Sequence, residues 1–230
     1  MSTKCQNCSN LGKHAFCSLG DEGRSFLESQ SVGVEYPRGT VLFREGDRCD
    51  AIFVVCSGKI KVSVTSREGR TMILRIADGG DVLGMSAALG GEPFEVTAES
   101  LEPSRVRVLH LKSLQYLLHH FSDASMCAAK ALAEDYKVAF DEARRFALPE
   151  TPAGRLARLL LDWADEAKGA GGTPTITMAL THEELASMTA TTRETITRTL
   201  GRFRKEKLIS IRGVALTLLQ PSALQQLSAC

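Results

Sequence analysis

The first half of the chain carries short apolar runs that end at turn residues. The runs are Thr40–Phe43, Ala51–Val55, Lys59–Thr65, Thr71–Ile76 and Val106–Leu111. Lys59–Thr65 and Val106–Leu111 alternate apolar with polar positions, as half-buried strands do. Turn sequences such as Glu45-Gly46-Asp47 separate the runs. Short strands at this regular spacing predict an antiparallel β-roll between residues 21 and 111.

A helical pattern replaces the strand pattern over residues 112–148. Apolar and small residues recur there at steps of three and four, at Met126, Ala129, Ala133, Tyr136, Phe140, Ala143 and Ala147. About three heptads of this kind indicate a two-helix coiled coil. The sequence therefore predicts a homodimer with Met126–Ala143 of this row at its interface. The alternative is a single helix that packs this face on its own domain.

The last third of the chain predicts a winged helix-turn-helix. Pro149 ends the long helix, and Thr151-Pro152 begins an amphipathic helix over Ala153–Ala167. A Gly-rich loop and a short strand at Ile176–Leu180 follow. Thr181 and Glu184 then form a capping box, and Thr192 caps a second helix after a turn at Thr189–Thr191. Two strand fragments that turn at Gly213 complete the wing.

The second of these helices carries the residues expected to bind DNA. Arg193, Glu194, Thr197 and Arg198 lie on one face near its start, where a recognition helix enters the major groove. Arginine matches the two acceptors of guanine, and glutamate accepts a hydrogen bond from the cytosine amino group. Phosphate contacts are expected from the cations that follow. The complete predicted DNA-binding set is Thr181, Thr192, Arg193, Glu194, Thr197, Arg198, Arg202 and Lys205.

These patterns together predict an α+β fold with four segments. They are a cysteine-bearing segment at 1–20, a β-roll at 21–120, a dimerisation helix at 121–148 and a winged-helix domain at 149–230. No apolar run approaches the ~20 residues of a membrane helix, and the start of the chain lacks a secretory signal. We therefore expect a cytoplasmic protein.

Charge and motifs limit the function classes. The chain has 28 Lys and Arg against 27 Asp and Glu, a formal net charge of +1, so DNA binding requires a local basic patch. No nucleophile–base pair, P-loop or His-Glu-x-x-His motif is present, so we expect no enzyme. Seven cysteines argue against a disulfide framework in a cytosolic chain. Cys5, Cys8 and Cys17 gather at the start and are candidate metal ligands or redox thiols.

The sequence resembles the Crp–Fnr family of bacterial transcription regulators over nearly its whole length. The resemblance rests on the helix at Arg193–Phe203, on the turns at Phe43–Asp47, Ser57-Gly58 and Gly80–Gly84, and on the heptad row. It implies a homodimer on near-palindromic double-stranded DNA, and contact with RNA polymerase. It also implies that Glu194 and Arg198 contact a GA core. Arg193 is similar to the cAMP-receptor branch and Thr197 to the Fnr branch, so the half-site is TGTGA-like or TTGAT-like.

The same resemblance bears on the signal. Glu92-Pro93 and Met85 stand where the cAMP-receptor branch holds its nucleotide, so no cAMP is expected. Cys5, Cys8 and Cys17 resemble the cluster-binding segment of the Fnr branch and imply a [4Fe–4S] cluster that responds to redox change, oxygen or NO. The fourth cysteine of that branch falls near Arg107, which leaves Cys49, Cys56, His14 or Asp21. The alternatives are a thiol–disulfide switch, a zinc site, a segment without ligand, or a small effector in the roll.

Overall fold

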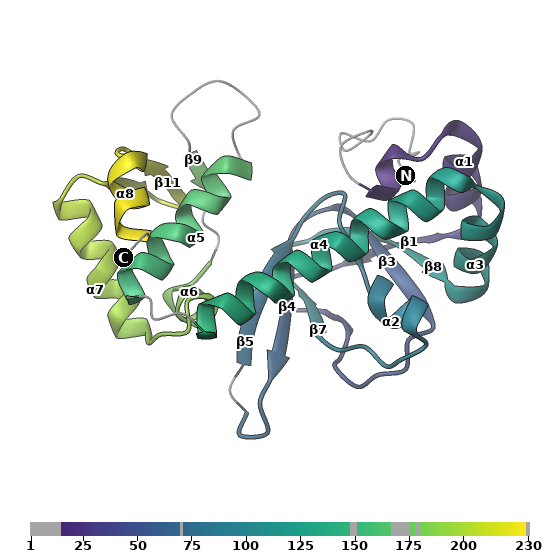
Figure 1. Ribbon diagram of the computed structural model, residues 1–230, viewed down its shortest axis with the longest axis horizontal. Helices are drawn as coiled ribbons and strands as arrows, with labels where there is room; N and C mark the ends of the chain where they lie inside the picture. Colours follow the sequence, from purple (N-terminus) through teal and green to yellow (C-terminus); the bar gives the residue numbers. More distant parts are fainter. Residues whose placement is uncertain (1–14, 70, 148–150, 167–174, 178–179, 229–230) are drawn as a thin grey trace. The chain divides into compact units, whose positions relative to one another are not determined.

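The computed structural model of the protein describes residues 15–69, 71–147, 151–166, 175–177 and 180–228 (Figure 1). The chain divides into two compact units, Met1–Asp141 and Glu142–Cys230. Within the described ranges, no helix is both long and apolar enough to cross a membrane. The finer predicted division into four segments stays a prediction.

Two four-stranded antiparallel sheets form the β-roll of the N-terminal unit. Their strand orders are β1-β8-β3-β6 and β2-β7-β4-β5. The strands are β1 (Val32–Tyr36), β2 (Val41–Phe43), β3 (Ala51–Ser57), β4 (Ile60–Thr65), β5 (Thr71–Ala77), β6 (Val82–Leu83), β7 (Thr97–Ser100) and β8 (Ser104–His110). Each of the five apolar runs forms most of one strand, although Thr40, Lys59 and Leu111 at their ends lie outside it. The fold class predicted from the sequence is confirmed.

Strand β3 is apolar throughout because both of its faces are buried. Phe53 and Val55 point into the roll, where Phe53 packs with Phe43 and Phe94. Ile52 and Val54 alternate with them and belong to a second core, formed with the helices outside the sheet. A strand buried on two sides loses the apolar–polar alternation of its neighbours, which explains the continuous run at Ala51–Val55.

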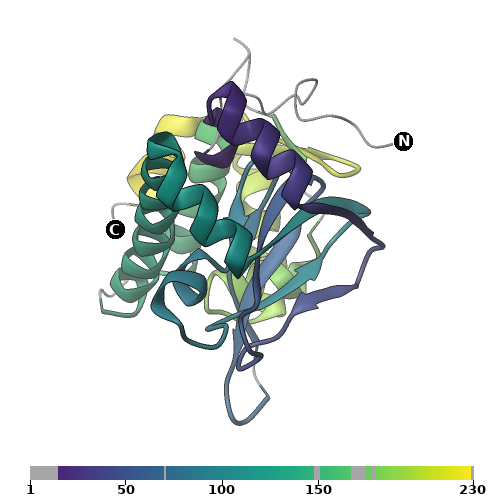
Figure 2. The same ribbon diagram turned by 90° about the vertical axis from the view of Figure 1, so that its right-hand side faces the viewer.

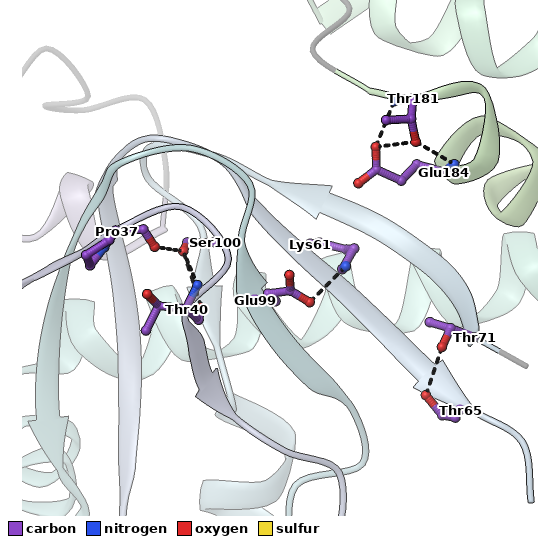
Figure 3. Close-up of polar contacts among 9 residues, drawn as sticks. All are labelled: Pro37, Thr40, Lys61, Thr65, Thr71, Glu99, Ser100, Thr181 and Glu184. Carbon is purple, nitrogen blue, oxygen red and sulfur yellow. Dashed lines mark hydrogen bonds and ion pairs between the residues drawn. The ribbon is translucent and has the colours of Figure 1, made fainter. Parts of the chain in front are cut away.

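Tight turns and cross-strand pairs fix the register of the roll. Gly58 links β3 to β4 with a φ of +92°, and a Cβ there would lie 2.7 Å from Ser104 Cα. Figure 3 shows the Lys61–Glu99 ion pair that joins β4 to β7 at 2.9 Å. The hydroxyl groups of Thr65 and Thr71 pair across β4 and β5 at 3.3 Å. Such pairs stabilise one register against its neighbours.

The helices of the N-terminal unit correct two sequence expectations. They are the 3₁₀ turn η2 (Ala15–Ser18), α1 (Asp21–Gln30), α2 (Met85–Gly90), α3 (Leu111–His120) and α4 (Ser122–Ala147). The strand-like region was predicted to begin at residue 21, but Asp21–Gln30 is helical, with two acidic residues in its first turn. The predicted helix at 112–148 is broken at Phe121, which is extended and packs on Phe26. Helices α1 and α3 lie side by side (Figures 1 and 2).

The C-terminal unit is a winged helix-turn-helix, as predicted. Its elements are α5 (Pro152–Glu166), β9 (Thr175–Thr177), α6 (His182–Met188), α7 (Arg193–Lys205), β10 (Ile209–Arg212), β11 (Ala215–Leu218) and α8 (Pro221–Ser228). The strands form one antiparallel sheet in the order β10-β11-β9. Helix α8 packs so closely on α5 that a Cβ at Gly154 would lie 2.8 Å from Leu227 O.

Candidate nucleic-acid interface and sensory site

Side-chain caps begin both helices of the helix-turn-helix. Thr181 Oγ1 accepts a hydrogen bond from Glu184 N at 3.2 Å, and Glu184 Oε2 accepts one from Thr181 N at 2.7 Å (Figure 3). Thr192 Oγ1 accepts from Thr195 N at 3.3 Å. The predicted capping box and N-cap are therefore confirmed. They fix where α6 and α7 start, and hence which residues occupy the first turns.

The turn between the two helices is held by a residue that the sequence analysis missed. Ala190 has a φ of +47°, in the left-handed region. Arg155, from α5, donates from Nε to Thr189 O at 2.6 Å and from Nη2 to Ala190 O at 3.2 Å. These two carbonyls lie at the end of α6, where a cation is favoured. Spacing along the chain could not have shown this contact, because Arg155 lies 34 residues before Thr189.

Helix α7 buries one face and opens the other. Ile196, Leu200 and Phe203 are buried against the rest of the C-terminal unit. The open face carries Arg193, Glu194, Thr197 and Arg198, all of them exposed. The predicted orientation is therefore confirmed, and two cations, one anion and one hydroxyl are available to a ligand. Their contact with DNA stays a prediction.

Further cations follow along α7. Arg202 and Lys205 are exposed, as are Arg204 and Lys207. The Arg202 guanidinium lies 5.6 Å from the centre of the Phe203 ring and 3.9 Å from the Glu206 carboxylate. Arg202 is thus held by neighbouring side chains, whereas Lys205 makes no ion pair within the part of the chain that the structure describes. Basic side chains in this last turn suit phosphate oxygens.

Thr197, on the open face of α7, has a polar partner that the sequence did not indicate. His182 Nδ1 lies 2.8 Å from Thr197 Oγ1. The contact joins the first residue of α6 to the open face of α7. At the wing, Gly213 turns with a φ of +60°, and Val214 beside it is 60% exposed.

Helix α4 carries the predicted dimer row on an open face. Met126, Tyr136 and Phe140 are 60%, 70% and 50% exposed, and the Tyr136 and Phe140 rings stack with centroids 6.1 Å apart. Ala129, Ala133 and Ala143 are exposed as well. The opposite face of the helix is buried through Ala124, Cys127, Ala128 and Ala131. The single-domain alternative is wrong for this row, because the N-terminal unit covers the other face instead.

Two of the three predicted ligand cysteines, Cys5 and Cys8, lie outside the described residues, and Cys17 is half-buried in η2. Among the residues that the structure describes, no group of three or more His, Cys, Asp or Glu could hold a metal ion. Cys56, a candidate fourth ligand, is half-buried at the point where the register of β3 shifts between Val55 and Ser57. Cys127 is buried.

The end of the cysteine segment is anchored on α4. Phe16 and Leu19, which flank Cys17, are buried in the same core as the α4 residues. Ser18 Oγ lies 3.6 Å from Cys127 Sγ. Gly20 N donates to Asp123 Oδ2 at 2.6 Å. The neighbours of Cys17 on both sides therefore contact α4, the helix that carries the apolar row.

The candidate fourth ligands differ in their surroundings. Burial raises the pKa of the Cys49 thiol, which disfavours the thiolate needed for metal binding. The Asp21 side chain is exposed and pairs with Arg24. Arg107, where the Fnr branch has its fourth cysteine, is 7% exposed and bonds Ser31 Oγ at 3.2 Å and Glu28 at 3.7 Å. Arg107 thus fastens β8 to α1 and supplies no ligand.

A charged network joins the roll to α4. Arg75 on β5 contacts Asp81 at 2.9 Å and Asp135 on α4 at 3.3 Å. Burial raises the pKa of the Asp135 carboxyl, and the nearby Arg75 guanidinium opposes that shift. Asp135 directly precedes Tyr136 of the apolar row. The network therefore ties the position of this row to the β-roll.

The cyclic-nucleotide positions of the roll lack cations. Met85 is fully buried, while Glu92 and Pro93 are exposed. A further carboxylate, Glu95, accepts a hydrogen bond from Ser86 Oγ of α2 at 3.1 Å. Met85, Glu92, Pro93 and Glu95 offer no donor to a phosphate, and the Ser86 hydroxyl donates to Glu95 instead.

The described chain thus combines a β-roll, a long helix and a capped winged helix. Residues 33–121 match the cyclic nucleotide-binding domain family, and residues 154–227 match the Crp-like helix-turn-helix domain family. The two matches cover most of the chain. They support a DNA-binding transcription regulator of the Crp–Fnr family.

The chain is also similar to individual proteins over most of its length. The CRP-like cAMP-activated global transcriptional regulator of Mycobacterium tuberculosis is 26% identical over 188 residues, 81% of this chain and 84% of that protein. The fumarate and nitrate reduction regulatory protein of Vibrio cholerae is 26% identical over 193 residues, 83% and 76% of the two chains. FixK2 of Bradyrhizobium japonicum has the same fold, with a TM-score of 0.78 at 19% identity over 87% and 98% of the chains.

Proposed function

We propose that the protein is a homodimeric, cytoplasmic transcription regulator whose affinity for a near-palindromic site changes with a redox, oxygen or NO signal at its N-terminal cysteines. The observation that carries the DNA-binding part is the open face of α7. Two guanidinium groups and a carboxylate are exposed there within the first two turns of a capped helix. A recognition helix places such residues against base edges in the major groove. RNA polymerase is the further partner expected at a promoter.

Dimerisation is supported by the open apolar row of α4. Two copies of the helix that meet through Met126, Ala133, Tyr136 and Phe140 would remove these side chains from water. A dimer also presents two α7 helices, which a palindrome with half-sites about 34 Å apart requires. Binding to a palindrome would therefore require both the dimer contacts of α4 and the DNA contacts of α7.

The donor chemistry of the cysteine segment supports an iron–sulfur cluster. Thiolates are the ligands that such clusters need, and a Cys-x2-Cys pair places two of them on one cluster. Cys5, Cys8 and Cys17 would hold the cluster, which would supply sensitivity to oxidants. A fourth ligand must come from elsewhere, because Arg107 is an ion-pairing residue. The anchoring of Phe16 and Leu19 beside α4 supports a route from this segment to the dimer row.

The second candidate function keeps the same regulator with a small-molecule effector in the β-roll and no metal. The match of residues 33–121 to the cyclic nucleotide-binding domain family favours it. Met85, Glu92, Pro93 and Glu95 disfavour a phosphate in that position, so the effector would be one without an anionic group there.

Purification without air separates the two candidates. We expect a coloured protein after iron and sulfide reconstitution, with iron and sulfide content that match one cluster per chain. The variants Cys5→Ser, Cys8→Ser and Cys17→Ser should lose the visible absorbance, whereas the control Cys230→Ser should keep it. Cys49→Ala and Cys56→Ser test the fourth ligand. A colourless, iron-free wild type excludes the cluster, and thiol counting before and after oxidation then tests the disulfide switch.

Gel shifts test DNA binding directly. The wild-type protein should bind TGTGA-like or TTGAT-like palindromes in preference to a scrambled duplex of equal length. Equal binding to both duplexes would exclude sequence recognition by α7. The same titration on oxidised and reduced protein measures the response to the signal.

A further inference from the structure

The contact between His182 and Thr197 connects the two helices of the DNA-binding motif at its open surface. His182 is the first residue of α6 and is half-buried, while Thr197 is exposed on α7. Their Nδ1 and Oγ1 atoms lie 2.8 Å apart. Both residues belong to helices whose starts are fixed by side-chain caps, so the contact has a defined place in the motif.

The direction of this hydrogen bond follows from a second contact of the same hydroxyl. Thr197 Oγ1 lies 2.9 Å from the carbonyl oxygen of Arg193, four residues earlier in the helix. A carbonyl oxygen can only accept, so the hydroxyl hydrogen of Thr197 points to Arg193 O. The bond to His182 must therefore use a lone pair of Oγ1, and the imidazole donates from Nδ1–H. One lone pair and the γ-methyl group of Thr197 remain for a ligand.

We propose that His182 is a positioning residue that determines which bases Thr197 accepts. A free threonine hydroxyl can donate or accept and therefore tolerates any base edge. Held by His182 and Arg193 O, it has no hydrogen left to donate. The acceptors N7 and O6 of guanine then find no partner, whereas the amino groups of adenine and cytosine meet a lone pair and the thymine methyl meets a methyl. Guanine is disfavoured opposite Thr197, whereas adenine, cytosine and thymine are accepted.

This inference rests on the proposed function, because it requires that α7 enters the major groove. It adds a residue outside α7 to the specificity of the site. His182 does not contact the base in this arrangement. Its effect on DNA recognition passes through Thr197 alone, which makes the two residues thermodynamically coupled.

The test measures affinity for palindromes that carry each of the four base pairs at one half-site position. Thr197→Val identifies the position, since its base preference changes there. We expect His182→Ala and His182→Gln to reduce discrimination against guanine at that position about two- to tenfold, the effect of one hydrogen bond. His182→Asn, whose amide N–H replaces the Nδ1 donor, should restore it. The control His119→Ala, an exposed histidine of α3, should leave it unchanged.

The coupling decides the outcome. In the Thr197→Val background, His182→Ala should have no further effect on the base preference at that position. The proposal is overturned if His182→Ala weakens all sequences equally, if His182→Asn fails to restore discrimination, or if the effect persists without the threonine hydroxyl. Wild-type protein that prefers no palindrome would instead refute the proposed function. Circular dichroism spectra of the variants establish that each is folded.

Discussion

Helices α4 and α7 are built alike on one side and differ on the other. Each buries a row of apolar residues within its own unit, Ala124–Ala131 in α4 and Ile196–Phe203 in α7. The open face of α4 carries aromatic and small side chains, whereas the open face of α7 carries guanidinium, carboxylate and hydroxyl groups. Removing an apolar face from water lowers the free energy. A charged face is stabilised instead by phosphate groups of opposite charge and by hydrogen bonds to base edges. The partners that we propose follow this difference, a second copy of α4 for the apolar face and DNA for the charged face of α7.

The largest effect is expected from a charge placed on the open face of α4. Tyr136→Glu or Phe140→Glu would bury an unpaired carboxylate at the centre of the proposed dimer, a cost of about 3–5 kcal/mol. Dimer affinity should fall by about a hundredfold or more. Sedimentation at micromolar concentration should then show monomers.

The control for this prediction is a charge substitution on the same helix at a residue that does not belong to the apolar row. Glu134→Lys alters an exposed position beside Ala133 and should leave the dimer intact. A dimer that survives Tyr136→Glu and Phe140→Glu together would show that the dimer forms through another surface.

The next effect concerns base recognition by α7. Arg198→Ala should cost about 1–3 kcal/mol of binding free energy and relax the preference at one base pair of each half-site. Competition titrations with singly substituted palindromes measure both quantities. Lys112→Ala, an exposed cation of α3, is the control and should change neither. Equal weakening on every sequence would assign Arg198 to the phosphates instead.

Local signals explain what the sequence could predict. The capping box of Thr181 and Glu184 and the N-cap Thr192 are set by residues three positions apart, so they were visible in the chain. The strands with apolar runs or strict alternation were visible for the same reason. The open rows of α4 and α7 follow from helical periodicity, which is also local.

Contacts between distant residues explain what it could not predict. Strands β1 and β7 have few buried apolar residues and exist because β8, β2 and β4 pair with them. Arg155 reaches the turn after α6, and His182 reaches Thr197, over separations that no periodicity reveals. The Arg75–Asp135 pair likewise joins residues 60 positions apart. These long-range contacts position the candidate site residues. The identity of those residues and their place on α4 and α7 could be predicted from the sequence.

The smallest effect separates phosphate contacts from base contacts on α7. Lys205 is exposed in the last turn, beyond the proposed base contacts at Arg193–Arg198, so Lys205→Ala should weaken binding to all sequences by a similar factor. Each lost phosphate contact should also reduce the slope of log affinity against log salt by about one unit, because fewer counterions are released. Titrations at several salt concentrations measure the slope. Lys205→Arg keeps the charge and should keep the slope, whereas an unchanged slope in Lys205→Ala would place this lysine away from the duplex and confine the DNA-binding face to the first turns of α7.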